Sequence, residues 1–325
     1  MDLRLTLYEL AARHRLDAAA SRRLHRLAGL EGEPPALASR LPRGVAILAA
    51  ALIGLGLVFW IAANWDALGR TGRFALLQGV VLVACAGAGW RPAARVPLGL
   101  VALLAIGGLF AYLGQTYQTG ADPWQLFALW AILVLPLVLA VRGDVLWTPW
   151  ILVAMAAISL WMHAHSGHRW RVEPHDLGVH LIGWGASVLL VVAMSSRARM
   201  VTGAGPWSLR TALTLWVVLV TSTAFAGLLQ ASVAPHYGLG LLLLAGAAAL
   251  LATPRFTEIY GLSVVALGLN TLLVAGLARL LFDDRRGDWI GPLLIVGVAA
   301  AGLLAAPYAQ DGAHAGRDAA AQGTP

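Results

Sequence analysis

The sequence predicts an all-α fold, a polytopic transmembrane helical bundle, and three observations support that prediction. Of the 325 residues, 59% are hydrophobic and only 12% are charged, which is about half the charged share of an ordinary soluble domain. The mean hydropathy is +0.74. Many uncharged runs also approach the ~20 residues that cross ~30 Å of hydrocarbon. These features exclude a soluble enzyme, a disulfide-stabilised secreted domain and a nucleic-acid binder.

About ten membrane-spanning helices account for the apolar runs, and their ends are placed to within ~2–4 residues. The first run follows a long polar and amphipathic segment, so no signal peptide is expected. The short fourth and fifth spans, joined by Arg142-Gly143-Asp144, either cross the membrane or form a re-entrant pair. Within a bundle domain of residues 44–307, the spans are predicted at 44–63, 74–90, 96–114, 125–142, 145–162, 178–196, 208–230, 237–253, 258–282 and 290–307.

The distribution of basic residues predicts the orientation of these spans. All 23 basic residues are arginine, and 16 of them lie in the segments on the same side as the amino terminus. Positive residues are enriched in cytoplasmic loops of membrane proteins. We therefore expect both termini in the cytoplasm, and we expect the net charge of +7 to set topology rather than to bind nucleic acid.

Several span ends and interfaces have local signals. Asp122-Pro123-Trp124-Gln125 is typical of a capping box opening the fourth span, and Asp144 and Ser208 can cap the fifth and seventh. Pro136 should kink the fourth span. Small residues allow close helix approach in lipid, so tight contacts are predicted at Gly54, Gly56, Gly107, Gly108, Gly183, Gly185, Gly238 and Gly240.

Residues 1–30 are predicted to form a cytoplasmic amphipathic helical hairpin. Apolar residues recur at helical spacing over 3–14, and Asp17 can cap a second helix over 18–29. The hairpin is too small for a core of its own, so it should dock on the membrane, the bundle or a partner. A DNA-binding domain would need a third helix. Residues 31–43 are interpreted as a linker and 308–325 as a disordered cytoplasmic tail.

Two short motifs resemble a known family. The run Gly54–Asp66 ends in Ala-Ala-Asn-Trp-Asp, and Leu113–Tyr117 reads Leu-Gly-Gln-Thr-Tyr. In their order and position relative to the spans, they resemble the bacterial predicted-membrane-protein family called domain of unknown function 2157, over roughly residues 1–165. The resemblance implies an amino-terminal helical hairpin, a first span ending in the first motif, and a bacterial inner-membrane location. It implies no activity, because the family has none established.

The two motifs supply the first candidate binding site. In the predicted topology, the first and third spans both run outward, so polar side chains at their ends emerge on one face. Amides, a carboxylate and a phenol there can form a polar pocket or an ion entrance. Helix caps and interfacial anchors are the structural alternative, which we favour. The candidate ligand-binding residues are Asn64, Trp65, Asp66, Gln115 and Tyr117.

A histidine-rich loop after the fifth span is the second candidate. Imidazoles at spacings of two and three, with Glu173 and Asp176 nearby, can bind zinc or copper. The spacing matches no defined metal site, so a solvated loop is the favoured interpretation. The candidate metal ligands are His163, His165, His168 and His175, and no cofactor is expected.

Taken together, these features favour a non-enzymatic membrane scaffold or sensor that acts with a membrane or cytoplasmic protein partner through the hairpin. The sequence shows no phosphate-binding loop, no supported Ser-His-Asp arrangement and no HExxH. The alternative is a transporter or channel for a small polar solute, entered near Asn64, Asp66 and Gln115. The lack of a mid-span Asp, Glu, Lys or Arg argues against coupled transport. The lipid bilayer is the other expected partner. The sequence leaves the oligomeric state open, and a homo-oligomer is one of the possible states.

Overall fold

The computed structural model describes residues 3–28, 35–64, 69–117, 120, 122–167, 172–230, 232–253 and 259–283. Over these ranges the secondary structure is helical, without a strand. The longer helices are α1 (Leu3–Arg13), α2 (Ala18–Leu27), α3 (Pro35–Ala63), α4 (Gly69–Trp90), α5 (Arg95–Tyr117), α6 (Pro123–Val141), α7 (Asp144–His165), α8 (Leu177–Ala193), α10 (Pro206–Leu228), α11 (Pro235–Ala252) and α12 (Ile259–Asp283). The shorter ones are η1 (Pro92–Ala94), η2 (Pro174–Asp176) and α9 (Arg199–Thr202).

Eight of these helices are long and apolar enough to cross a membrane, namely α4 to α8 and α10 to α12. The helix before them, α3, includes a shorter apolar part at Gly44–Gly56. The predicted polytopic helical bundle is therefore confirmed, with ends close to the predicted ones. The short fourth and fifth spans are α6 and α7, with 19 and 22 residues, so both reach the length of a full span. The predicted tenth span, 290–307, and the tail lie outside the described residues.

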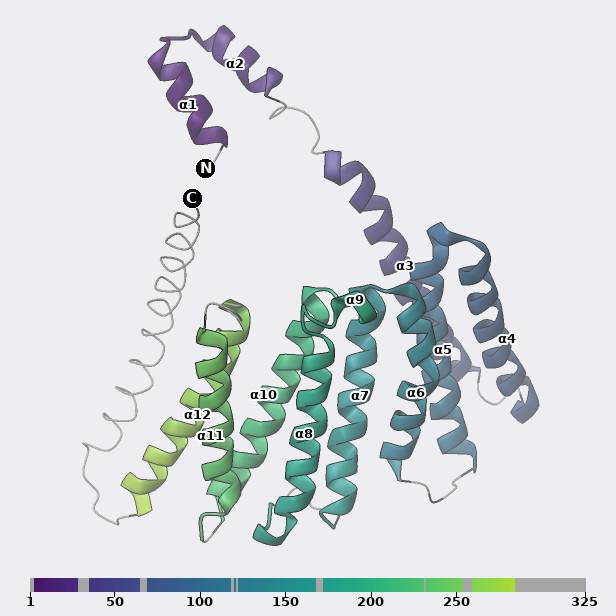
Figure 1. The fold of residues 1–325 in the computed structure, drawn as a ribbon. Helices are drawn as coiled ribbons and strands as arrows, with labels where there is room; N and C mark the ends of the chain where they lie inside the picture. Colours follow the sequence, from purple (N-terminus) through teal and green to yellow (C-terminus); the bar gives the residue numbers. More distant parts are fainter. Residues whose placement is uncertain are drawn as a thin grey trace.

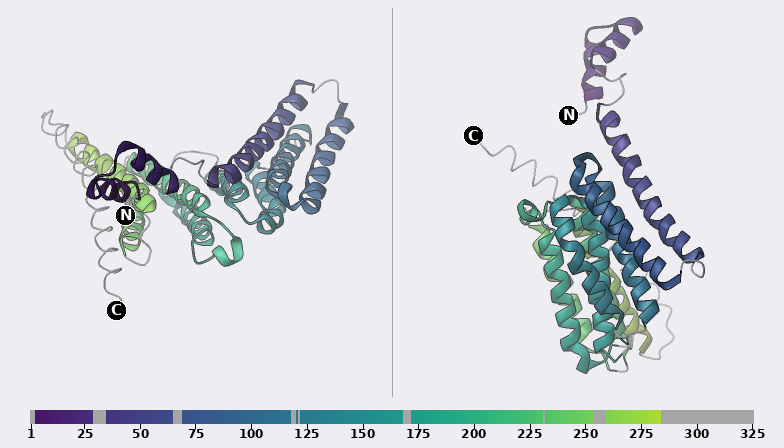
Figure 2. Two further views of the ribbon diagram at one scale, coloured as in Figure 1. Left: turned by 90° about the horizontal axis from the view of Figure 1, so that it is seen from above. Right: turned by 90° about the vertical axis from the view of Figure 1, so that its right-hand side faces the viewer.

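The spans form an extended array in which three helices are central. Helix α5 packs against α3, α4, α6 and α7, while α7 packs against α8 and α10. Helix α10 in turn contacts α11 and α12. Between 44% and 50% of α5, α7 and α10 is buried, against 17% of α4, α6 and α11. Seen from above, α3 and α4 lie at one end of the array and α11 and α12 at the other (Figure 2).

Glycine allows the closest approaches between these helices, as predicted, but only at part of the predicted positions. A Cβ on Gly107 would overlap the indole of Trp130, one on Gly183 would overlap Met162, and one on Gly54 would come within 2.8 Å of Leu104. A Cβ on Gly240 would likewise overlap the Cβ of Ala224. By contrast, open space lies beside the Cβ positions of Gly56, Gly185 and Gly238.

Indole N–H groups join neighbouring helices through hydrogen bonds to backbone carbonyls. Trp130 Nε1 of α6 donates to Leu103 O of α5 at 3.1 Å, and Trp150 Nε1 of α7 donates to Ala131 O of α6 at 2.8 Å. Trp147 is almost fully buried and donates to Thr202 O at 2.8 Å. Because lipid offers no hydrogen-bond partner, such donors must be satisfied within the protein.

The carboxylate of Asp144 fixes the start of α10. Asp144 is the first residue of α7, and Gly143 is the N-cap of that helix. The backbone N–H groups of Gly205, Trp207 and Ser208 donate to Asp144 at 2.9–3.2 Å, and the Ser208 hydroxyl donates to it as well. The prediction that Asp144 and Ser208 cap their own helices is therefore corrected. Asp144 satisfies first-turn amides of another helix, which have no partner within that helix.

The other predicted helix starts and kinks have mixed outcomes. Helix α6 begins at Pro123 after Asp122 as predicted, but Asp122 makes no side-chain capping bond. Pro136 lies inside α6, which remains helical from Pro123 to Val141. In the amino-terminal hairpin, Asp17 Oδ1 accepts the Ala20 N–H at 2.7 Å, so the predicted cap of α2 is confirmed. The segment predicted as a linker is helical from Pro35 onward, as the first part of α3.

Figure 1 shows the pair α1–α2 set apart from the bundle, beyond the end where α3 begins. The short helix α9 lies at that same end of the bundle, and the α7–α8 connection lies at the opposite end (Figure 1). The two ends of the bundle therefore carry different features. One end carries the hairpin and the Asp144 contacts, and the other carries the histidine-rich connection.

Candidate functional site

The first predicted site is described only in part. Asn64 follows the last residue of α3, and its side-chain Nδ2 donates to Trp60 O at 2.9 Å, so it binds the end of its own helix. Trp65 and Asp66 lie outside the described residues. Gln115 and Tyr117 belong to the last turn of α5, and only their backbone is described. Helices α3 and α5 end on the same side of the bundle, away from the hairpin (Figure 1). The polar pocket proposed there stays a prediction.

The histidine-rich loop does not assemble a metal site among the described residues, where no group of three or more candidate ligands is found. His165 Nδ1 lies 2.9 Å from Trp161 O, and its ring packs 4.6 Å from the Trp161 ring. His175 is exposed, with Glu173 at 3.4 Å and Asp176 at 3.3 Å. His168 lies outside the described residues. The remaining candidate, His163, faces a different environment.

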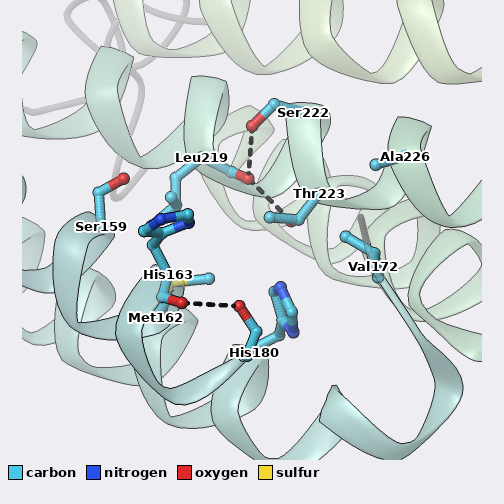
Figure 3. Close-up of a pocket in the computed structure, with 10 residues that line it drawn as sticks. Ser159, Met162, His163, Val172, His180, Leu219, Ser222, Thr223 and Ala226 are labelled. Atoms are coloured by element: carbon cyan, nitrogen blue, oxygen red, sulfur yellow. Dashed lines mark hydrogen bonds between the residues drawn. The ribbon is translucent and has the colours of Figure 1, made fainter. Parts of the chain in front are cut away.

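His163 and His180 line a cavity between α7, α8 and α10. The cavity has a volume of about 130 Å³. Its lining residues belong to the end of α7, the α7–α8 connection, the start of α8 and the later part of α10, and these helix ends lie opposite the hairpin (Figure 1). Figure 3 shows the lining side chains around a common space. They are Ser159, Met162, His163, Ser166, Val172, His180, Leu219, Ser222, Thr223 and Ala226. Six of the ten are serine, threonine or histidine, in helices that are otherwise apolar.

The local sequence explains why these polar groups face one space. The α7–α8 connection returns the chain beside α7, so His180 in the first turn of α8 lies near the last turns of α7. Ser222 and Thr223 lie five or six residues before the end of α10, which ends at the same side. Val172, in the α7–α8 connection, is buried and contributes to the wall of the cavity.

A third histidine, His236, packs behind the cavity wall. His236, near the start of α11, is fully buried, and neither ring nitrogen has a hydrogen-bond partner. Its ring lies 4.8 Å from the His180 ring at an interplanar angle of 88°. Gly227 of α10 permits this position, because a Cβ there would lie 3.0 Å from His236 Cβ. A neutral imidazole carries one N–H donor, and a buried donor without a partner costs about 1–3 kcal/mol.

Most of this site was missed from the sequence. His163 was a candidate only as a loop metal ligand, and His236 and the hydroxyl groups of α10 were not candidates. One signal was available, since Thr221-Ser222-Thr223 places three hydroxyl residues in succession within an apolar span. The contact between His180 and His236 joins residues that are far apart in the sequence, so no local pattern shows it.

Comparison with known proteins supports the family resemblance. Residues 8–147 match the model of a family described as predicted membrane protein (DUF2157), which confirms the resemblance drawn from the two motifs. No curated protein and no solved structure matches the chain. The matched region extends from α1 to the start of α7, so the cavity lies beyond it. The chain is thus a membrane protein with several apolar helices, whose matched part includes the hairpin.

Proposed function

We propose that this protein is a non-enzymatic scaffold or sensor of the bacterial inner membrane, and that its hairpin α1–α2 binds an acidic cytoplasmic protein. The single observation that carries the proposal is the position of this hairpin, which stands clear of the bundle (Figure 1). Both termini then lie in the cytoplasm, in accord with the distribution of arginines. The alternative of a transporter entered near Asn64, Asp66 and Gln115 rests on the sequence alone.

The hairpin surface combines exposed apolar side chains with arginines. Tyr8 and Leu27 are 62% and 80% exposed, so each offers apolar surface to a partner. The exposed arginines of the hairpin include Arg13, Arg15, Arg22 and Arg23. Exposed apolar side chains together with arginines on one small element complement an acidic protein surface that also offers apolar side chains.

The length of α3 favours a partner in the cytoplasm over the lipid surface. Its apolar part begins at Gly44, and the nine helical residues before it extend for ~13 Å at 1.5 Å per residue. The headgroup layer on each side of a bilayer is only ~5–7 Å thick. The hairpin therefore begins beyond the headgroups, where it meets soluble proteins first.

A photo-crosslinking amino acid at Leu27 of the full-length protein in cells tests the proposal. We expect an adduct with one cytoplasmic protein, because Leu27 is exposed beside the basic face. The adduct should be lost in an Arg22→Glu/Arg23→Glu variant. It should persist in Arg91→Glu, since Arg91 is an exposed arginine at the turn between α4 and α5. Adducts only with lipid, or only with other parts of the chain, would contradict the proposal.

A further inference from the structure

We infer that the cavity between α7, α8 and α10 is a binding site for a small, neutral, polyhydric alcohol. This inference is independent of the function proposed for the hairpin. It rests on the hydrogen-bonding state of the lining groups, on the absence of fixed charge among them, on the volume, and on the buried His236.

The lining groups mainly offer hydrogen-bond acceptors. The Ser222 hydroxyl donates to Leu219 O at 3.1 Å, so its remaining capacity is as an acceptor. His180 Nδ1 lies 2.9 Å from Asp176 O. A carbonyl only accepts, so this nitrogen carries the hydrogen and Nε2 of the neutral ring is an acceptor. The ligand must therefore donate several hydrogen bonds.

One lining group can also donate. Ser159 contributes a hydroxyl that bonds to none of the other described residues. Thr223 is nearly saturated, because it donates to Leu219 O at 2.8 Å and accepts the Trp184 Nε1 hydrogen at 3.0 Å. A polyol matches this balance, since each of its hydroxyls both donates and accepts.

Charge and size narrow the ligand class further. None of the described residues that line the cavity is Asp, Glu, Lys or Arg, so an ion bound there would find no compensating charge among them. A volume of about 130 Å³ is slightly below the 150 Å³ of a cavity that accommodates benzene. Met162 and Leu219 provide apolar surface for CH groups. A polyol the size of glycerol satisfies all three conditions.

The buried His236 supports a binding role for its neighbour. Its ring stands perpendicular to that of His180 and, with the Asp176 carbonyl, restricts the orientation of the His180 ring. His236 is thus a positioning residue rather than a ligand contact. Like Trp216 Nε1 and Thr221 Oγ1, the ring nitrogens of His236 have no hydrogen-bond partner among the described residues. The edge-to-face ring contact with His180 is therefore the interaction that supports this positioning role.

Thiol accessibility tests the site in full-length protein in nanodiscs. In a Cys85→Ala background, Ala226→Cys introduces a thiol at a lining position whose side chain offers no hydrogen bond to a ligand, and Ser159→Cys is a second reporter of water access. We expect a water-soluble methanethiosulfonate to modify both within about tenfold of the rate at His175→Cys in the exposed loop. Ile182→Cys, on the exposed surface of α8, should react at least a hundredfold more slowly.

Protection then identifies the ligand class. Glycerol at high concentration should slow modification of Ala226→Cys at least threefold and leave His175→Cys unchanged, whereas the larger polyol mannitol should protect neither. His180→Phe in the Ala226→Cys protein should keep the reactivity and abolish the protection. Reaction of both cavity thiols as slow as that of Ile182→Cys would overturn the inference, because the cavity would be closed to water. Equal rates with and without glycerol would overturn it too, because the cavity would then hold water only.

Discussion

Replacing Asp144 by alanine should detach the start of α10 from the start of α7. The carboxylate accepts the backbone N–H groups of Gly205 and Ser208 at 2.9 and 3.0 Å, and Ser208 is fully buried. Without the carboxylate, two donors that water reaches poorly lose their partner, at ~1–3 kcal/mol each. Lost interaction with the positive end of the α10 dipole adds ~0.3–1 kcal/mol. These terms sum to ~2–7 kcal/mol. We expect a net loss near the lower end, ~3 kcal/mol, because water can replace part of the lost bonding at Gly205, which is only partly buried.

Thermal unfolding in nanodiscs, followed by tryptophan fluorescence, measures this loss. At ~2 °C per kcal/mol for a large domain, Asp144→Ala should lower Tm by ~6 °C. Asp144→Asn retains one acceptor oxygen, so its effect should be smaller. Glu9→Ala is the control, since Glu9 is an exposed acidic residue of α1, which stands apart from the bundle. A Tm for Asp144→Ala within ~1 °C of the parent, or equal losses in Asp144→Ala and Glu9→Ala, would refute the reasoning.

Two further predictions concern packing and topology. Gly107→Ala should lower the free energy of unfolding by ~1–3 kcal/mol, because a Cβ there overlaps the Trp130 indole. Gly238→Ala is the control and should have little effect in the same assay, because open space lies beside that Cβ position. In a cysteine-free background, a membrane-impermeant thiol reagent added to intact cells should label His175→Cys and not Ala20→Cys. Labelling of Ala20→Cys from outside would reverse the proposed orientation.

The positions of the spans could be predicted from the sequence because the bilayer imposes length and hydrophobicity on each helix separately. Contacts between helices depend on which helices pack side by side in the fold, and no local sequence pattern specifies that. Asp144 shows the difference, since the sequence indicated an acidic residue at a helix start, but the helix it caps begins 62 residues later at Pro206. The glycines show it as well, because a Cβ on Gly107 would overlap an indole, whereas a Cβ on Gly56 would have open space beside it.

The candidate sites were predicted less well than the spans, for a related reason. From the sequence, runs of polar residues in loops were selected as candidate sites, and the histidines near His163 were interpreted as one local cluster. In the folded chain, His165 packs on Trp161 of its own helix, while His180 packs on His236 from a helix more than fifty residues later. A polar site inside a membrane protein is assembled from single residues on several spans, so local density in the sequence is a poor guide to it.

The hydrogen bonds between helices are distributed unevenly along α7 and α10, and this bears on how the cavity works. At the hairpin end, Asp144 and the Trp147 indole hold the start of α10 and the end of α9 to α7. At the opposite end, the cavity separates the same two helices, and His236 beside it has no hydrogen-bond partner. Polar bonds between helices restrict their separation. Among the described residues, α7 is hydrogen-bonded to α10 at the hairpin end, whereas at the cavity end the Trp184 indole bonds α8, not α7, to α10. Ligand contacts that bridge Ser159 of α7 and Ser222 of α10 would therefore link α7 directly to α10 at the cavity end.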